Sequence, residues 1–267
     1  MRDFLQTYWV YIKTFFKAKS QYKTSFILGM LANFYCYFIT YITYWVLTDG
    51  AGEIAGWDFP DLSILYGLSL LTYSISGTLI WYTAYHLEDL IINGQLDVML
   101  IRPQGLLRQM IFQRFGDTFL GQILVTVIFL CSAFALRTEY LTGAKPLYLL
   151  LVIIGGVFLQ TGSMILFGAL SFWTMKSREL IGVVFYDLRA ITNYPLLIYP
   201  KAVRLILTFV LPWAFINYYP AMLITGKDSS VFERILGLAA PLVGAAWLLF
   251  AILIFRMGVR RYTGAGS

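Results

Sequence analysis

Charged residues are scarce in this chain. Only 13% of its 267 residues are charged, whereas an average soluble domain is about 25% charged. Hydrophobic residues make up 59% of the chain, and its mean hydropathy is +0.72. This low content of charged residues cannot cover a water-facing surface. Much of the protein surface must therefore lie in lipid. The sequence excludes an ordinary soluble domain and predicts a single membrane domain over residues 1–267.

Histidine and cysteine are almost absent too. His86 is the only histidine, which argues against a histidine-based metal cluster or a triad that needs a histidine. Cys36 and Cys131 fall within apolar stretches and are no disulfide framework. No Gly-x-x-x-x-Gly-Lys-Ser/Thr phosphate loop occurs, so the chain lacks that kind of ATP site. We therefore expect no cofactor or metal in this chain and no enzymatic activity of its own.

Long apolar stretches are what the chain does have. We assign six of them as membrane spans, each long enough to cross about 30 Å of hydrocarbon as a helix. The sequence therefore predicts an all-α integral membrane protein with six transmembrane helices. The predicted spans are residues 26–47, 62–84, 118–136, 147–174, 180–200 and 235–255.

The basic residues predict the orientation of these spans. With six spans and the N-terminus inside, thirteen of the twenty Lys and Arg residues fall on the cytoplasmic side and six outside. The first outer loop holds Asp49, Glu53, Asp58 and Asp61 and no basic residue. Cytoplasmic loops of membrane proteins carry an excess of Lys and Arg. The net charge of +6 therefore reflects topology rather than nucleic-acid binding, and both termini are predicted to be cytoplasmic.

Two polar regions flank the early spans. Residues 1–23 predict an interfacial helix, because apolar side chains from Phe4 to Phe16 fall on one arc and lysines on the other. Residues 85–116 form the largest polar insertion, on the cytoplasmic side. Here residues 86–92 predict a helix that Gly94 ends, since glycine accepts a left-handed backbone. A second short helix should follow and end at Pro103, and an amphipathic segment should lead into the third span.

Residues 179–227 allow more than one arrangement. The stretch 205–224 is also long enough to cross, but two crossings here would put the terminal arginines outside. We therefore predict one crossing at 180–200, followed by re-entrant helices at 201–226 that dip into the outer leaflet, because prolines interrupt the region. In the alternative, residues 180–199 lie on the inner surface, with Lys201 and Arg204 as inside charges.

Ionisable residues inside a span are costly and point to function. Asp187 and Arg189 are the clearest pair, but they are two residues apart and do not face each other on a helix. They either pair with neighbouring helices or line a solute path. Asn33, in the first span, is a further candidate for that path, although polar residues of this kind more often pack helices together.

Three patterns together resemble one family. Residues 94–103 read Gly-Gln-Leu-Asp-Val-Met-Leu-Ile-Arg-Pro and match the pattern Gly-x-Leu/Phe-Asp-x-x-Leu-x-Arg-Pro. Residues 194–220 carry a proline-marked stretch, and the chain ends in a basic, glycine-containing segment from Arg256 to Gly266. On these patterns the chain resembles the permease subunits of type-2 ABC exporters. It is most similar to the bacterial branch whose ATPase is of the daunorubicin-resistance type and often serves two different permeases.

The resemblance implies a transport subunit that lies in the bacterial cell (inner) membrane and works in a complex. It implies two cytoplasmic ATP-binding subunits that hold Mg-ATP, and a second permease, either a different chain or a copy of this one. It implies that residues 86–103 dock on the ATPase and that residues 201–226 form an outer gate. The docking residues would be Glu88, Asp89, Gly94, Leu96, Asp97, Leu100, Arg102 and Pro103, and the gate residues Tyr194, Pro195, Pro200, Pro212 and Pro220.

A rival interpretation is an ion-coupled secondary transporter or channel. Such proteins carry inverted repeats and paired intramembrane carboxylates. The sequence shows no convincing repeat, and Asp187 stands alone within its span. The ATP-driven exporter is therefore the preferred interpretation, and the secondary transporter remains the alternative.

Overall fold

The computed structural model describes residues 13–14, 17, 23–113, 116–174, 176–228 and 230–264. These residues form helices and loops, and no strand is found among them. The interfacial helix expected over residues 1–23 falls, apart from a few positions, outside the described residues. Among those residues, five helices are long and apolar enough to cross a membrane, or six if one strongly bent pair counts as a span. The all-α membrane fold is thereby confirmed.

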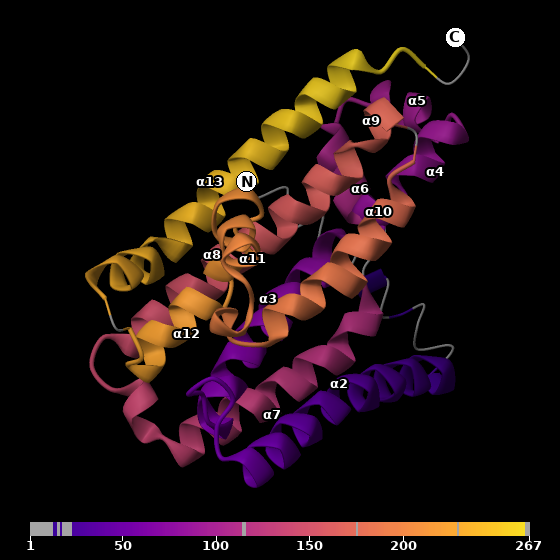
Figure 1. Cartoon of the computed structure of the whole chain (residues 1–267). Helices are drawn as coiled ribbons and strands as arrows, with labels where there is room; N and C mark the ends of the chain where they lie inside the picture. The colour runs from indigo at the N-terminus through magenta and orange to yellow at the C-terminus, as the bar shows by residue number, and fades with distance from the viewer. Residues whose placement is uncertain are drawn as a thin grey trace.

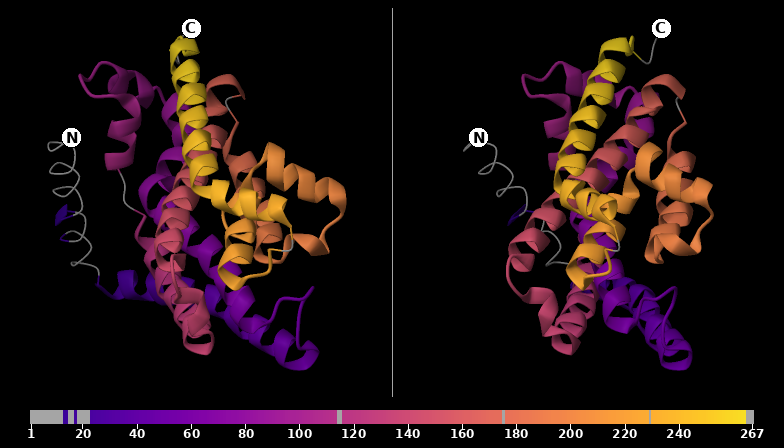
Figure 2. Two further views of the ribbon diagram at one scale, coloured as in Figure 1. Left: turned by 90° about the vertical axis from the view of Figure 1, so that its left-hand side faces the viewer. Right: turned by 60° about the vertical axis from the view of Figure 1, so that its left-hand side comes forward.

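The five long helices pack side by side as a bundle, with the shorter helices gathered around them (Figure 1). Most of α3 is buried within the bundle, whereas α2 lies at its edge beside α7 and is exposed along its apolar length (Figures 1 and 2). The five are α2 (Lys23–Ala51), α3 (Phe59–Tyr85), α7 (Leu120–Leu136), α8 (Lys145–Ala169) and α13 (Val231–Arg261).

Helices α8 and α13 make the most extensive contact in the bundle, and Figure 1 shows them running together along their length. Small residues permit it. A Cβ atom at Gly244 of α13 would collide with the carbonyl oxygen of Gly155 on α8, and one at Gly155 would meet Pro241. In lipid there is no hydrophobic force between helices, so small residues that let backbones touch are a main source of packing.

One end of the bundle is held by paired charges. Asp58 and Asp61 form a capping box at the start of α3. Two later loops reach these carboxylates. In the loop after α7, Arg137 pairs with Asp58, and Tyr140 donates a hydrogen bond to Asp61. The ammonium of Lys227 lies 3.0 Å from Asp61. The loops after α2, α7 and α12 (Tyr218–Thr225) therefore meet here, at what we call the Asp61 end.

Tyr140 shows how closed this cluster is. Its side chain is 1% exposed. Burial and the neighbouring Asp61 carboxylate raise the pKa of its phenol well above the ordinary value. The phenol therefore stays protonated and acts as a donor to Asp61.

The opposite end gathers the short helices and the end of α13 (Figure 1). The arginine side chain at the start of α10 (Arg178–Gly182) pairs with Asp89, and Phe172 packs against Phe255 of α13. We call it the α5 end, after the helix Gln95–Leu100. Successive loops between the long helices thus lie alternately at the Asp61 end and at the α5 end. This is the arrangement that the charge pattern predicts for helices that cross a membrane in alternating directions.

The segment from α10 to η5 runs along α3 from the α5 end towards the Asp61 end. It consists of α10, the π-helical turn η4 (Val183–Asp187) and the 3-10 helix η5 (Leu188–Asn193). Its contacts with α3 follow in order: Arg178 over Tyr85, Tyr186 against Trp81, Arg189 over Tyr73, and Thr192 beside Ser69. This course along α3 favours the crossing over the alternative in which residues 180–199 lie on the inner surface.

The predicted fifth span needs a correction at its far end. Helical backbone stops at Asn193, and Tyr194 is extended, so the helix does not reach Pro200. The reason is local, because the residue before a proline is pushed out of the helical region. The helix from Arg178 to Asn193 is thus shorter than the roughly 20 residues of an ordinary span.

A bent hairpin follows. Lys201–Val210 (α11 and η7) and Trp213–Thr225 (η8 and α12) meet at an angle of 78°. At the tip, the Trp213 indole donates to Ser163, which lies nearer to Ala169 than to Lys145 along α8. From there α12 returns to the Asp61 end, where Lys145 donates to the carbonyl of Ile224. Residues 178–228 therefore make one net traverse of the bundle plus a hairpin, which favours the prediction of one crossing over two. The membrane boundaries themselves stay a prediction.

The α8–α13 contact predicts a stability effect. We expect Gly244→Ala to destabilise the protein by about 1–3 kcal/mol, because the added methyl group must push two backbones apart. Thermal unfolding in detergent measures it. Gly29→Ala is the matched control, since nothing lies within 4 Å of a Cβ there and alanine favours a helix over glycine by about 1 kcal/mol. A Gly244→Ala protein at least as stable as the Gly29→Ala protein would contradict the close approach.

Candidate functional site

The helices at the α5 end form as the sequence predicted. The helix α4 (Leu87–Ile92) continues from α3 after a turn at His86. Gly94 then takes a left-handed conformation with φ of +66° and separates α4 from α5. Helix α5 ends at Leu100, shortly before Pro103, and α6 (Leu106–Gln113) follows. The sequence therefore predicted this local structure correctly, including the role of the glycine.

Buried side chains hold α4 and α5 in place. Leu96 is fully buried, and Met99 is 3% exposed. The side-chain amide of Gln109, on α6, donates to the carbonyl of Met99 at 2.9 Å and to that of Gln104 at 2.7 Å. Thr83 of α3 donates in turn to the carbonyl of Met110. These contacts connect the short helices to the long helix α3, so they form a platform rather than a loose loop.

The outward side of this platform is exposed and partly apolar. Ile101 is 84% exposed and Val98 53%. Asp97, Arg102 and Pro103 of the predicted docking set lie among them and are also exposed. We call the exposed residues on this side of the platform the α5 surface. Its residues are Asp97, Val98, Leu100, Ile101, Arg102 and Pro103.

Four of the predicted docking residues lie elsewhere: Leu96 is buried inside the platform, Gly94 forms the turn before α5, and the other two are acids on α4. The Glu88 carboxylate accepts hydrogen bonds from the backbone N–H groups of Ser177 at 2.7 Å and Arg178 at 2.9 Å. Asp89 pairs with Arg178 and contacts His86 at 2.9 Å. Both acids therefore hold the start of α10 and are not part of the α5 surface. No local pattern revealed this contact, because its partners lie about ninety positions apart in the sequence.

A groove adjoins the α5 surface. It has a volume of about 600 Å³ and lies between residues 103–108 and the last turns of α13. Arg108, Arg256 and Arg260 line it together with apolar side chains. The α5 end is therefore basic as well as apolar, which fits the predicted cytoplasmic position of these arginines.

The predicted gate residues lie partly before the bent hairpin and partly within it, so they do not gather at one place. Tyr194 and Pro195 follow the end of η5, and Pro200 precedes α11. Pro212 is at the tip of the hairpin, and Pro220 is buried in the first turn of α12. The prolines thus mark the helix ends and the bend of the hairpin.

The predicted pathway residues separate in the structure. Arg189 is buried, with its guanidinium 4.0 Å from the Tyr73 ring centre, whereas Asp187 is exposed on the bundle surface. Within the described ranges neither forms an ion pair. Asn33 donates to the carbonyl of Gly29 and accepts from Gln122 of α7. Asn33 therefore contributes to the α2–α7 contact, as polar packing residues do.

Comparison with known protein families connects this architecture to a class of transporters. The model of the family described as "ABC-2 family transporter protein" matches residues 34–266. Neither the curated proteins nor the solved structures with which the chain was compared contain a match. The family match includes the α5 platform, the hairpin and the long helices from Phe34 on, and it confirms the resemblance to type-2 permeases. The chain therefore belongs to the ABC-2 transporter family and is a transmembrane permease component of an ABC transporter.

Proposed function

We propose that this chain forms half of the pathway of an ATP-driven exporter and docks a separate cytoplasmic ATPase through the α5 surface. In this proposal two ATPase subunits bind and hydrolyse Mg-ATP, and a second permease, a different chain or else a copy, completes the pathway. The chain itself performs no catalysis. It lies in the bacterial cell (inner) membrane with both termini in the cytoplasm, since the α5 end carries Arg102, Arg108, Arg178, Arg256 and Arg260.

The observation that carries the proposal is the composition of the α5 surface. Exposed apolar residues rimmed by polar ones usually mark a contact with another protein. Ile101 and Val98 expose more than half of their surfaces, and Asp97 and Arg102 lie close by in the sequence. The platform beneath them is fixed by the bonds of Gln109 to the carbonyls of Met99 and Gln104. A rigid, partly apolar projection suits a cleft in a soluble partner.

The exposure of α2 supports a second permease. The apolar stretch of α2 is not buried by the rest of this chain, although α2 makes contacts with α7 and α3. A helix that is apolar all round needs either lipid or another protein around it. A second permease against this side would cover part of α2 and close a pathway between two chains.

The mechanism follows from how the platform is attached. ATP draws the two ATPase subunits together and moves the platform at the α5 surface. The platform connects to α3 through Thr83 and Met110, and to the start of α10 through the Glu88 carboxylate. Movement of the docked ATPases therefore reaches α10 and the hairpin as well as α3. The permease halves rock about their interface, and the hairpin acts as the outer gate.

Docking at the α5 surface predicts a loss of assembly in one variant. We expect Ile101→Asp to lower the affinity for the ATPase by about 2 kcal/mol, or about 30-fold, because it places a charge where an apolar side chain is buried in the complex. Co-purification from mild detergent, followed by titration of the ATPase, measures it.

Leu141→Asp is the matched control for this variant. Leu141 is also an exposed apolar residue, but it lies in the loop after α7 at the Asp61 end. It should leave ATPase binding unchanged. Equal binding by the wild type and the Ile101→Asp protein would place the docking surface elsewhere.

The Glu88 contact predicts a different defect. We expect Glu88→Gln to retain ATPase binding but to lower the transport-stimulated ATPase rate several-fold. It replaces charge-assisted hydrogen bonds, worth about 1.5–3 kcal/mol, by neutral ones. Glu179→Gln is the control, because Glu179 is an exposed acid in the first turn of α10. If the two variants behaved alike, or if Glu88→Gln lost the ATPase altogether, Glu88 would not have this transmitting role.

A further inference from the structure

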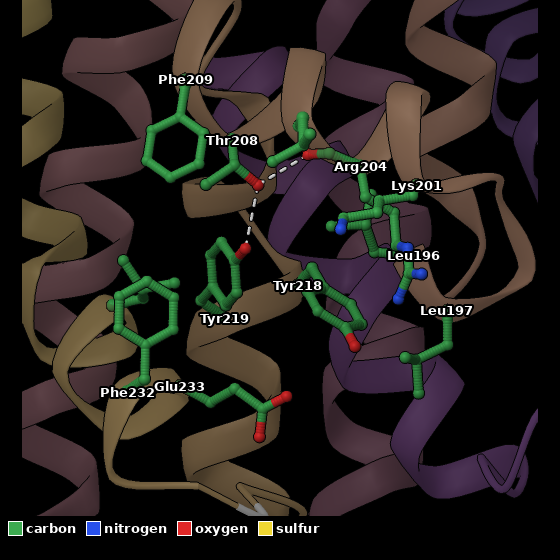
Figure 3. Close-up of a pocket in the computed structure, with 12 residues that line it drawn as sticks. Leu196, Leu197, Lys201, Arg204, Thr208, Phe209, Tyr218, Tyr219, Phe232 and Glu233 are labelled. Atoms are coloured by element: carbon green, nitrogen blue, oxygen red, sulfur yellow. Dashed lines mark hydrogen bonds between the residues drawn. The ribbon is translucent and has the colours of Figure 1, made fainter.

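A pocket lies between the two arms of the hairpin and the start of α13 (Figure 3). Its volume is about 260 Å³. It is distinct from the α5 surface, since α13 begins at the Asp61 end. Basic, aromatic and aliphatic side chains from these elements line the pocket. They include Lys201, Arg204, Thr208, Phe209, Tyr219 and Phe232.

The pocket is a built feature, because its floor joins the two arms. The hydroxyl groups of Thr208 and Tyr219 lie 2.9 Å apart, and Thr208 also donates to the carbonyl of Arg204 at 2.8 Å. Thr208 belongs to η7 and Tyr219 to α12. Both side chains are largely buried. The space between the arms is therefore held open by hydrogen bonds and is not a gap left by loose packing.

The polar side of the pocket has an excess of positive charge. Lys201 and Arg204 lie one turn apart on α11, and neither forms an ion pair in the part of the chain that the structure describes. The Nε donor of Arg204 is buried and has no hydrogen-bond partner. Buried polar groups almost always have a partner, so this donor points to a group that binds there.

The acid in the pocket wall does not cancel this charge. Glu233 is the third residue of α13, and its carboxylate accepts a hydrogen bond from the Ser230 backbone in the capping box of that helix. It therefore belongs to the helix cap, next to the positive end of the α13 dipole. The two cations on α11 outnumber it.

The remaining lining is apolar and open to the surroundings. Phe209 is 66% exposed, Phe232 61% and Leu197 51%. In Figure 3 the rings of Phe209 and Phe232 lie on one side, the nitrogen atoms of Lys201 and Arg204 on the other, and the two tyrosine rings between them. The pocket therefore offers one polar and one apolar side to the same ligand.

We propose that this pocket binds the headgroup of an anionic phospholipid, with the phosphate at Lys201 and Arg204 and an acyl chain along Phe209 and Phe232. A pocket for a whole drug-sized molecule has about 300–1,000 Å³, so 260 Å³ suits only the head of an amphiphile. The exposed apolar side chains leave a path along which the rest of the acyl chain can lie outside the pocket. Basic pockets among transmembrane helices are a recurrent way to hold acidic lipids. Binding here does not depend on ATPase docking at the α5 surface.

The test is lipid binding to the purified full chain with whatever partners accompany it. Native mass spectrometry would follow titration with phosphatidylglycerol and, separately, with phosphatidylcholine of the same acyl chains. We expect tighter binding of phosphatidylglycerol. Lys201→Gln and Arg204→Gln should each weaken it about fivefold, the effect of about 1 kcal/mol for each basic residue, and leave phosphatidylcholine unaffected.

Two controls separate the pocket from general effects. Arg234→Gln removes a nearby cation that pairs with Asp228 and does not line the pocket, so it should bind phosphatidylglycerol as the wild type does. Arg204→Lys preserves the charge but lacks the Nε donor, so it should bind more tightly than Arg204→Gln and more weakly than the wild type. This variant separates loss of charge from misfolding. Equal binding of both lipids would overturn the proposal, as would equal losses in the Arg234→Gln and Arg204→Gln proteins. Displacement of the lipid by excess inorganic phosphate would overturn the lipid assignment.

Discussion

One buried amide, that of Asn217, holds the irregular part of this protein against its regular bundle. The side chain is 1% exposed and donates to the carbonyl of Thr192 at 2.7 Å and to that of Leu65 at 3.2 Å. Within a membrane, non-helical backbone is tolerated only where protein or trapped water satisfies its polar groups. The end of η5, the return arm of the hairpin and the first half of α3 meet at this point. The proposed gate and the proposed lipid pocket both depend on that junction.

The segment 178–228 is held at three points, and they differ in kind. At its start the Glu88 carboxylate binds the backbone of Ser177 and Arg178, and at its end Lys227 pairs with Asp61. The middle has mainly neutral contacts, such as those of Asn217. The ion pairs of this segment lie at the ends of the bundle, where water reaches them. The contacts between the ends are mainly neutral, with Arg189 over the Tyr73 ring as the exception, since an ion within the hydrocarbon is costly.

The sequence predicted the regular parts well and the irregular part only in outline. Length and hydropathy suffice for a long helix such as α8, and the conformational needs of Gly94 and Pro103 suffice for α4 and α5. Pro195 indicates that the helix should end near Asn193. The predicted span nevertheless ended too late, at residue 200, because the apolar stretch continues past Asn193. The Glu88 contact and the pocket bring together residues that are distant in the chain. The periodicity of the sequence does not predict such long-range contacts.

The difference between the three attachments has a mechanical consequence. Hydrogen bonds to charged groups are worth about 1.5–3 kcal/mol and neutral ones about 0.5–1.5 kcal/mol. When α4 moves, its bond to α10 through Glu88 should therefore persist, and the neutral bonds near the hairpin should yield first. Thr208 and Tyr219 are among those neutral partners, and they form the floor of the pocket. A lipid seated there would stabilise one arrangement of the arms, so the platform and the lipid act on the same segment from opposite ends.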